Sequence, residues 1–286
     1  MPQTILVTGG TGYIGSHTCV QLLERGFDVV IADNLANSSE TVVEVIARLA
    51  GRAPAFERVD VTDTDAVAAL FRRHPIEAVI HFAGLKAVGE STAQPLRYYR
   101  TNLESAMILL DQMAAHDVHQ FVFSSSATVY GVPETLPIPE TAATAPTNPY
   151  GRTKLMIEDI CRDLAAADER WRISLLRYFN PVGAHPSGDL GEDPRGTPNN
   201  LVPFVMQVAV GRRRQLQVFG ADWDTHDGSG VRDYIHVLDL AAGHLAALAH
   251  EDPGCHVFNL GTGTGASVFD VIKTTENVSG ASVPYE

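Results

Sequence analysis

The sequence contains little cysteine, and the cysteines that it has are far apart. Cys19, Cys161 and Cys255 are the only three among 286 residues, and no two have the spacing of a metal-binding pair. An odd number of scattered cysteines argues against a disulfide framework and is typical of reduced thiols. Long apolar runs are also absent, since no window is long enough to span a membrane. The first residues show no basic segment followed by an apolar one, so we expect a soluble, cytoplasmic protein.

Basic residues are scarce relative to acidic ones. Lys and Arg number 21, Asp and Glu number 34, and the net charge is −13 with His neutral. A chain this acidic has no general attraction for nucleic acid or anionic membranes, so we expect neither as a partner. An anionic substrate would therefore have to be held by a few local cations. Apolar residues make up 45% of the chain, which is enough for a sizeable core.

Short β-branched runs alternate with longer helical patterns through the first 180 residues. The runs are apolar on both faces, which predicts an α/β fold with a doubly wound parallel sheet of the Rossmann type. The pattern loosens after Asn180, so we predict a larger domain over 1–180 and a smaller mixed α/β domain over 181–286, with the chain free to interleave. The predicted strands are 4–8, 28–32, 55–59, 78–82, 120–124, 172–177, 217–219 and 256–260; the predicted helices are 13–25, 40–49, 63–73, 95–116, 150–166, 201–210, 237–249 and one from 267.

A glycine-rich segment follows the first predicted strand and opens the first helix. Gly9, Gly12 and Gly15 give it the pattern G-x-x-G-x-x-G. Glycine permits the tight turn and removes side chains that would block a pyrophosphate, while the helix N-terminus presents unpaired N–H groups. Asp33 ends the second predicted strand, where a carboxylate accepts hydrogen bonds from an adenosine ribose and repels a 2′-phosphate. These features predict an NAD site, and Asp60, after the third strand, is a further candidate beside the adenine.

Tyr150 and Lys154 lie four residues apart at the start of a predicted helix, so their side chains share one face. A free tyrosine has a pKa near ~10 and cannot act as a base at neutral pH. A neighbouring ammonium group and a positive nicotinamide ring would both favour the phenolate. The serines at 124–126 end a predicted strand, at the edge where doubly wound sheets bind ligands, and a hydroxyl there can pass a proton to Tyr150. A packed tyrosine beside a lysine is the ordinary interpretation of the spacing, but the glycine pattern and the serine-rich strand end favour catalysis.

These motifs and several longer blocks resemble one enzyme family. The glycine pattern, the serine cluster and the Tyr-x-x-x-Lys pair look like those of the extended short-chain dehydrogenase/reductase superfamily. Within it, the chain resembles the UDP-glucose 4-epimerases over essentially its whole length. The blocks that carry this resemblance are 82–91 (FAGLKAVGES), 176–184 (LRYFNPVGA) and 230–237 (GVRDYIHV).

The resemblance implies an isomerase of galactose metabolism that interconverts UDP-glucose and UDP-galactose with tightly bound NAD. In such an enzyme Tyr150 takes the proton of the sugar 4-hydroxyl while C4 passes hydride to NAD; the 4-keto sugar then turns over, and hydride returns to the opposite face. Ser126 would bridge the hydroxyl to Tyr150, and Lys154 would bind the nicotinamide ribose and lower the Tyr150 pKa. Arg232 would pair with the diphosphate, a task that suits the guanidinium fork.

The resemblance also implies two sets of binding residues and no metal ligands. The residues implied for NAD are Gly9, Gly12, Tyr13, Ile14, Gly15, Asp33, Asn34, Asn37, Asp60, Val61, Phe82, Ala83, Gly84, Lys86, Ser124, Tyr150, Lys154 and Tyr178. The residues implied for the UDP-sugar are Lys86, Ser126, Tyr150, Phe179, Asn180, Asn200, Leu201 and Arg232. By the same resemblance we expect a homodimer formed through the helices at 95–116 and 150–166.

Three other functions remain open at this point. A 4-epimerase of another UDP-sugar would use the same catalytic residues. A sugar-nucleotide 4,6-dehydratase needs an acidic residue beside the serine, whereas Ala127 and Thr128 follow Ser126. A non-catalytic NAD-binding sensor should have lost Tyr150 or Lys154, and both are present. The chain also stops before the segment with which the family usually clamps the uridine, so we expect the smaller, substrate-binding domain to be incomplete at its C-terminus.

Overall fold

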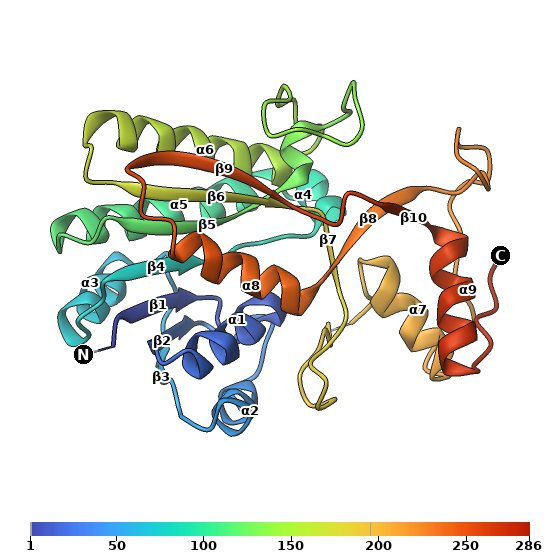
Figure 1. Ribbon diagram of the computed structural model, residues 1–286, viewed down its shortest axis with the longest axis horizontal. Helices are drawn as coiled ribbons and strands as arrows, with labels where there is room; N and C mark the ends of the chain where they lie inside the picture. The colour runs from blue at the N-terminus through green and yellow to red at the C-terminus, as the bar shows by residue number, and fades with distance from the viewer. Residues whose placement is uncertain (1, 195) are drawn as a thin grey trace.

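A seven-stranded parallel sheet lies at the centre of the molecule (Figure 1). The computed structural model describes residues 2–194 and 196–286, and the strand order is β3-β2-β1-β4-β5-β6-β9. The chain winds outward in both directions from the β1–β4 pair, and doubly wound sheets bind their ligands outside the carboxyl ends of the strands at this point. The predicted doubly wound α/β fold is confirmed. The strands are β1 (Thr4–Thr8), β2 (Asp28–Asp33), β3 (Ala55–Arg58), β4 (Ala78–His81), β5 (Gln120–Ser126), β6 (Arg172–Tyr178) and β9 (Gly254–Leu260).

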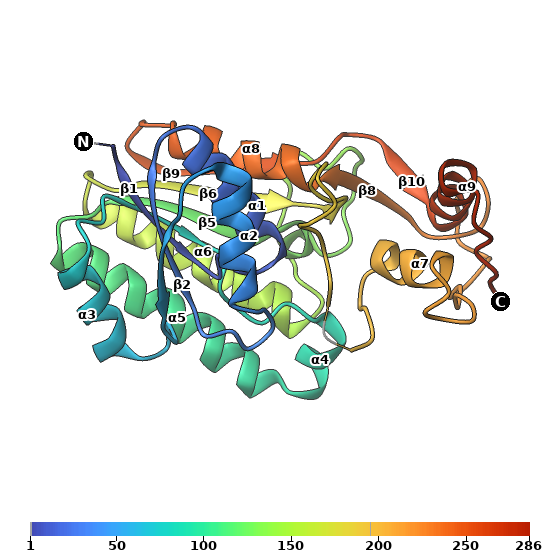
Figure 2. The ribbon, with the colours of Figure 1, turned by 90° about the horizontal axis from the view of Figure 1, so that it is seen from below.

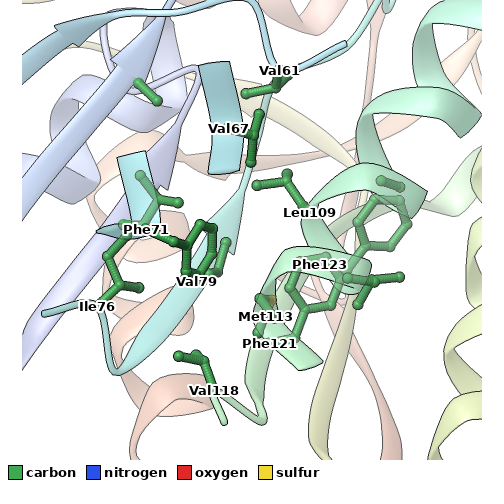
Figure 3. Packing of buried hydrophobic residues seen from close by; sticks show 14 of the residues in the cluster. Val61, Val67, Phe71, Ile76, Val79, Leu109, Met113, Val118, Phe121 and Phe123 are labelled. Carbon is green, nitrogen blue, oxygen red and sulfur yellow. The ribbon is translucent and has the colours of Figure 1, made fainter. Parts of the chain in front are cut away.

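Helices cover both faces of this sheet (Figure 2), which is why β1 and β4 are buried along their whole length. On one face Phe71, Leu109 and Phe121 belong to one apolar cluster under α3, α5 and α6 (Figure 3). On the other face Leu22 and Leu240 join α1 and α8 to the sheet. None of the helices in the described part of the chain is long and apolar enough to cross a membrane. The helices around the sheet are α1 (Tyr13–Glu24), α2 (Thr41–Ala50), α3 (Thr64–Arg73), α4 (Val88–Ala93), α5 (Pro95–Ala115), α6 (Pro149–Ala167) and α8 (Val237–Leu248), with the 3-10 turn η1 (Ala127–Tyr130) after β5.

A small three-stranded sheet and two helices form the other end of the molecule (Figure 1). Strand β8 (Val231–His236) lies between β7 (Asn180–Val182), to which it is parallel, and β10 (Gly265–Ser267), to which it is antiparallel. Helices α7 (Leu201–Ala209) and α9 (Val268–Ser279) pack together in a separate apolar cluster.

The chain passes between the two sheets more than once. After β8 in the small sheet it enters α8, which packs against α1, and then β9, which pairs with β6 in the large sheet. A boundary at residue 180 therefore separates the two sheets only in part, because the apolar side of α8 packs against the large sheet and the half-buried β9 pairs with β6 along its whole length.

The strand predicted at 217–219 is wrong. The segment makes a single bridge, between Leu216 and Tyr285, with hydrogen bonds from Leu216 N to Pro284 O (2.8 Å) and from Glu286 N to Leu216 O (3.0 Å). Val218 N also donates to Glu286 O at 2.8 Å, and the pairing ends after Val218 because Phe219 is exposed and Gly220 turns the chain with φ of +87°. A short apolar run without a partner strand of equal length does not become a strand.

Candidate active site

The glycine-rich loop forms a tight turn between β1 and α1. Gly9 has φ of +69°, a left-handed conformation that favours glycine. A Cβ on Gly15 would lie only 2.4 Å from the Gly9 carbonyl oxygen, so the first turn of α1 lies directly against the loop. Gly12 occupies the N-cap position and offers no side-chain cap to the N–H groups of the first turn. The loop thus exposes backbone donors at the positive end of a helix, as a pyrophosphate requires.

We expect Gly15→Ala to lower the free energy of unfolding by about 1–3 kcal/mol, because the new methyl group must push backbone away. The purified variant should also retain less NAD. The matched control is Gly89→Ala, where a Cβ would meet no atom within 4 Å. Thermal unfolding and the NAD content released on denaturation measure both effects. Equal stability of the two variants would show that the close approach at Gly15 is not a constraint.

Asp33 organises the end of β2. Its carboxylate accepts hydrogen bonds from Thr11 N (3.2 Å), Leu35 N (2.8 Å) and Ser38 Oγ (3.3 Å), which joins the glycine-rich loop to the turn after β2. An ionised carboxylate has about four acceptor sites, so it can still accept a bond from a ribose hydroxyl.

Asp60 lies beside this turn, after β3. Asn34 Nδ2 donates to it at 3.0 Å, as do the backbone N–H and the hydroxyl of Thr62. Burial alone would raise the pKa of Asp60, but these hydrogen bonds outweigh it and lower the pKa below its ordinary value. Of the implied adenosine residues, Asp33, Asn34 and Asp60 thus lie together, whereas Asn37 is exposed at the loop tip.

The loop after β4 is held by a residue that the sequence analysis did not select. Asn102, buried on α5, accepts from Leu85 N (2.8 Å) and donates to Leu85 O (3.1 Å) and to Thr153 Oγ1 (3.0 Å). It therefore ties the 82–86 loop to α5 and α6 at once. Its signal in the sequence was a polar residue amid the apolar face of a helix. Phe82 packs against the His244 ring, with the ring centroids 4.6 Å apart.

Tyr150, Lys154 and the serine cluster meet where α6 crosses the carboxyl end of β5. Lys154 Nζ donates to Ser124 O at 2.7 Å and lies 5.9 Å from the centroid of the Tyr150 ring. The Ser126 hydroxyl lies close enough to Tyr150 to affect its pKa, and it accepts a hydrogen bond from the hydroxyl of Thr128 at 2.9 Å. Asn148 caps α6 by accepting from Gly151 N at 2.9 Å, which fixes the turn that carries Tyr150.

Burial dominates the electrostatics of these groups. It raises the pKa of Tyr150, against a smaller opposite effect of the nearby Ser126 hydroxyl. It lowers the pKa of Lys154 to about 8, although the negative charge of Glu158 opposes the shift. It also lowers the pKa of His81 to about 3, with Lys154 adding to the effect, so His81 is neutral beneath the site. The protein groups alone therefore favour the phenol at Tyr150, and ionisation requires a further positive charge beside the ring.

Tyr178, at the end of β6, completes the floor of the site. Its hydroxyl forms a short hydrogen bond with Ser124 Oγ, and its ring lies 5.9 Å from that of His244. Burial raises the pKa of Tyr178 above its ordinary value, so it remains a phenol that can donate or accept. Tyr178, Ser124 and Lys154 are thereby connected through one residue of β5.

The residues implied for the UDP-sugar come from three places. Glu192 Oε1 accepts from Lys86 Nζ at 3.4 Å and from Asn200 Nδ2 at 3.2 Å. A carboxylate that no motif indicated therefore lies between two of the residues implied for the UDP-sugar. Asn180 donates to Asp233 O at 2.9 Å and is fixed to β8. Arg232 is largely exposed on β8, where it donates to Val231 O. The other two residues implied for the UDP-sugar are sequence neighbours of Asn180 and Asn200. Phe179 lies beside Gly261, and Leu201 begins α7.

The fold and these side chains define a dinucleotide-binding enzyme with a Tyr-x-x-x-Lys pair. The side chains fit NAD: a cradle that admits no Cβ precedes a helix N-terminus, a carboxylate ends β2, and a buried ammonium lies beside a tyrosine.

The chain belongs to the NAD dependent epimerase/dehydratase family, whose model matches residues 5–261. It is 58% identical to the UDP-glucose 4-epimerase of Bacillus subtilis (strain 168), over 99% of this chain and 84% of that protein. The corresponding enzyme of Bos taurus is 54% identical, over 100% of this chain and 85% of that protein. Among solved structures, UDP-glucose 4-epimerase from Bifidobacterium longum in complex with NAD+ and UDP has a TM-score of 0.97 and 52% identity, covering 99% of this chain and 85% of that chain. The resemblance seen in the motifs is confirmed.

Proposed function

We propose that the chain interconverts UDP-glucose and UDP-galactose by inverting C4 of the sugar. The observation that carries the proposal is the meeting of Tyr150, Lys154 and Ser126 at the carboxyl end of the sheet, beside a cradle suited to NAD. The group beside Ser126 is the Thr128 hydroxyl, at 2.9 Å, where a 4,6-dehydratase would need a carboxyl group. This contact favours the epimerase over the dehydratase.

In the proposed reaction Tyr150 is the base that takes the proton from the 4-hydroxyl group and later returns it. Ser126, whose hydroxyl lies beside Tyr150, relays that proton. The Lys154 ammonium, directed by the Ser124 carbonyl, stabilises the phenolate. NAD, when bound, supplies the acceptor and donor of the C4 hydride. Because the protein groups favour the phenol, the positive nicotinamide ring would make Tyr150 a base only in the loaded enzyme.

The two ends of the molecule divide the binding tasks. We propose that the loops after β1, β2, β3 and β4, through Asp33 and Asp60 among others, hold NAD, together with Lys154 and Tyr178. Lys86, Asn180, Asn200 and other implied residues of the smaller domain would hold the UDP-sugar, and Arg232 would pair with its diphosphate. Tyr13 joins the two sets, because its hydroxyl donates to Gly183 O at 2.7 Å.

We further propose a cytoplasmic homodimer. Helices α5 and α6 lie side by side (Figure 1) and expose Leu96, Met107 and Met156, whose exposed fractions are 77%, 42% and 42%. Exposed large apolar side chains on paired helices suit an isologous helix contact, and three free thiols suit a reducing compartment. Light scattering at micromolar concentration tests the dimer, and a monomer would contradict it.

The direct test of the activity is incubation of the purified protein with UDP-galactose, without added NAD, followed by an assay for UDP-glucose. Formation of UDP-glucose would establish the 4-epimerase and show that NAD co-purifies. A 4-keto-6-deoxy product from dTDP-glucose would instead support the dehydratase. If neither product forms even with added NAD, the sensor function or another UDP-sugar would be favoured.

A further inference from the structure

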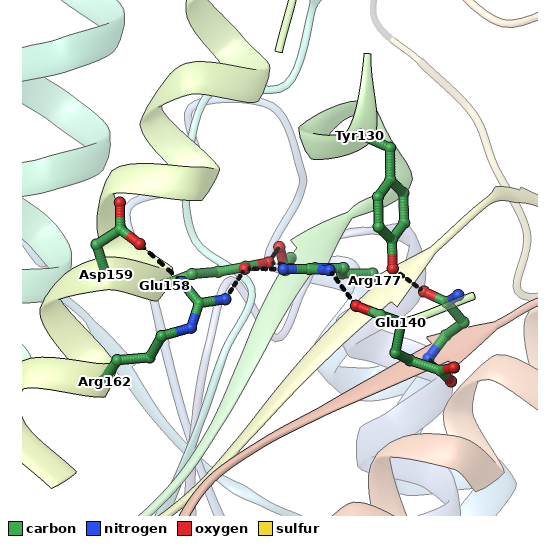
Figure 4. Close-up of polar contacts among 8 residues, drawn as sticks. Tyr130, Glu140, Glu158, Asp159, Arg162 and Arg177 are labelled. Carbon is green, nitrogen blue, oxygen red and sulfur yellow. Dashed lines mark hydrogen bonds and ion pairs between the residues drawn. The ribbon is translucent and has the colours of Figure 1, made fainter. Parts of the chain in front are cut away.

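A buried charged cluster joins α6 to β5 and β6 (Figure 4). Glu158 of α6 is fully buried, and Arg177 of β6 is 2% exposed. Arg177 donates from Nε to Glu158 Oε1 (2.9 Å) and from Nη2 to Glu158 Oε2 (2.5 Å). Ser125 Oγ donates to Oε1 at 2.5 Å and Arg162 Nη2 to Oε2 at 2.7 Å, so both carboxylate oxygens are shared between two donors.

The cluster extends from Arg177 to the segment that joins β5 to α6. Arg177 Nη1 donates to Glu140 O at 3.3 Å, and the guanidinium carbon lies 4.8 Å from the centroid of the Tyr130 ring in η1. The Tyr130 hydroxyl donates to Asn259 Oδ1 of β9 at 2.7 Å (Figure 4). One guanidinium group therefore connects α6, η1, the 131–148 segment and, through Tyr130, strand β9.

Residues of this cluster lie next to the proposed catalytic groups on the same strand and the same helix. Ser125 and Arg177 are paired neighbours on β5 and β6. Ser125 stands between Ser124, whose carbonyl oxygen accepts from the Lys154 ammonium, and Ser126, whose hydroxyl lies beside Tyr150. On α6, Glu158 is one helical turn beyond Lys154 on the same face. The carboxylate thus holds the helix that bears the tyrosine and lysine against the strand that bears the serines.

We propose that Glu158, with Arg177, is a positioning residue that sets Tyr150 and Lys154 against β5 for proton transfer. The inference rests on the proposed epimerase activity. A buried ion pair is a poor way to gain stability, because apolar residues of similar volume often stabilise as well or better. The pair supplies something that apolar packing does not: four directional hydrogen bonds to a single carboxylate, and a negative charge one turn from Lys154. A displacement of about 1 Å at a catalytic group can cost about a hundredfold in rate.

The test compares the wild type with Glu158→Gln and with the triple variant Ser125→Ala, Arg177→Met, Glu158→Leu. The single change leaves a buried guanidinium poorly paired and can impair folding, whereas the triple change replaces the cluster by apolar groups and should keep stability near that of the wild type. We expect the triple variant to unfold near the wild-type temperature, yet to lose about ten- to a hundredfold in kcat with KM changed less than about threefold. The control is Glu57→Gln, a carboxylate on β3 paired with Arg73, which should leave kcat unchanged.

A second readout does not depend on sugar turnover. The phenolate of Tyr150 can be titrated by ultraviolet difference absorbance of the NAD-loaded protein against Tyr150→Phe in each background. If the ammonium of Lys154 is no longer held beside the ring, the pKa of Tyr150 in the triple variant should rise by at least about half a unit. A wild type that does not turn over UDP-galactose would refute the proposed function, and the titration would still decide the role of the cluster. A stable triple variant with wild-type kcat, or with an unchanged Tyr150 pKa, would overturn the inference.

Discussion

Tyr150→Phe is expected to lower kcat by about a thousandfold or more while NAD stays bound. In the proposed mechanism the Tyr150 hydroxyl is the group that takes the proton from the sugar and gives it back, and general bases contribute about 10²- to 10⁴-fold. The glycine cradle and Asp33 are untouched by the change, so the NAD that co-purifies should remain near the wild-type amount.

The loss should not reflect unfolding. Ser126 keeps its bond with the Thr128 hydroxyl when the tyrosine oxygen is removed, so no buried group is left without a partner there. Tyr285→Phe is the matched control, because this half-exposed ring lies beside α9 at the far end of the molecule (Figure 1). Turnover of UDP-galactose, NAD content and the unfolding temperature are measured on both variants. A Tyr150→Phe enzyme with more than about a tenth of wild-type kcat would remove Tyr150 from the role of base.

The large sheet could be predicted because most of its strands contain a run of apolar residues. Strands β1 and β4 have no exposed residue, and an unbroken apolar run of that length is the ordinary sign of a strand covered on both faces. Strand β8 carries no such sign. It contains Arg232 and Asp233 and is only partly buried, because one small sheet with two helices leaves much of it exposed. Its existence depends on pairing with β7 and β10, which are far from it in sequence.

Contacts between residues far apart in the sequence also limited what could be predicted of the site. The glycine pattern, Asp33 and the Tyr150–Lys154 pair are local motifs, whose spacing within one turn or one helix can be recognised without a structure. Asn102 and Glu192 act on residues 17 and 106 positions away, and nothing in their own surroundings in the sequence indicates those contacts. Glu158 and Arg177 are ordinary helix and strand residues until the register of β5 and β6 brings Ser125 and Arg177 beneath α6.

Lys154→Met is expected to lower kcat by about a thousandfold or more. The same change should stabilise the NAD-free protein at pH 7. In the proposed mechanism activity falls because the phenolate loses the cation that stabilises it, and the nicotinamide ribose would lose a hydrogen-bond donor. Stability rises because the folded protein holds a buried ammonium whose pKa, about 8, is well below the ordinary 10.5. That difference corresponds to about 3 kcal/mol spent on keeping the charge in the core at neutral pH. The variant also loses the hydrogen bond to Ser124 O and the contact with the Phe123 ring, and these losses offset part of the gain. We therefore expect the free energy of unfolding to rise by about 1 kcal/mol in total.

The pH dependence separates this explanation from better packing by methionine. Between pH 8 and 10.5 the unfolded wild type still binds a proton that folded Lys154 has released, so wild-type stability rises with pH over this range. Since the variant has no lysine at this position, its stability does not rise in this way, and its advantage over the wild type should shrink above pH 8 and disappear before pH 10.5. Lys273→Met on α9 is the matched control, because this lysine is exposed and its replacement should change the unfolding free energy by less than about 0.5 kcal/mol at every pH. Urea unfolding of the three proteins from pH 7 to pH 10.5 measures the differences. A variant advantage that stays constant with pH would mean that Lys154 is not held as a strained cation in the folded protein, and the charge that favours the Tyr150 phenolate would then have to come from the cofactor alone.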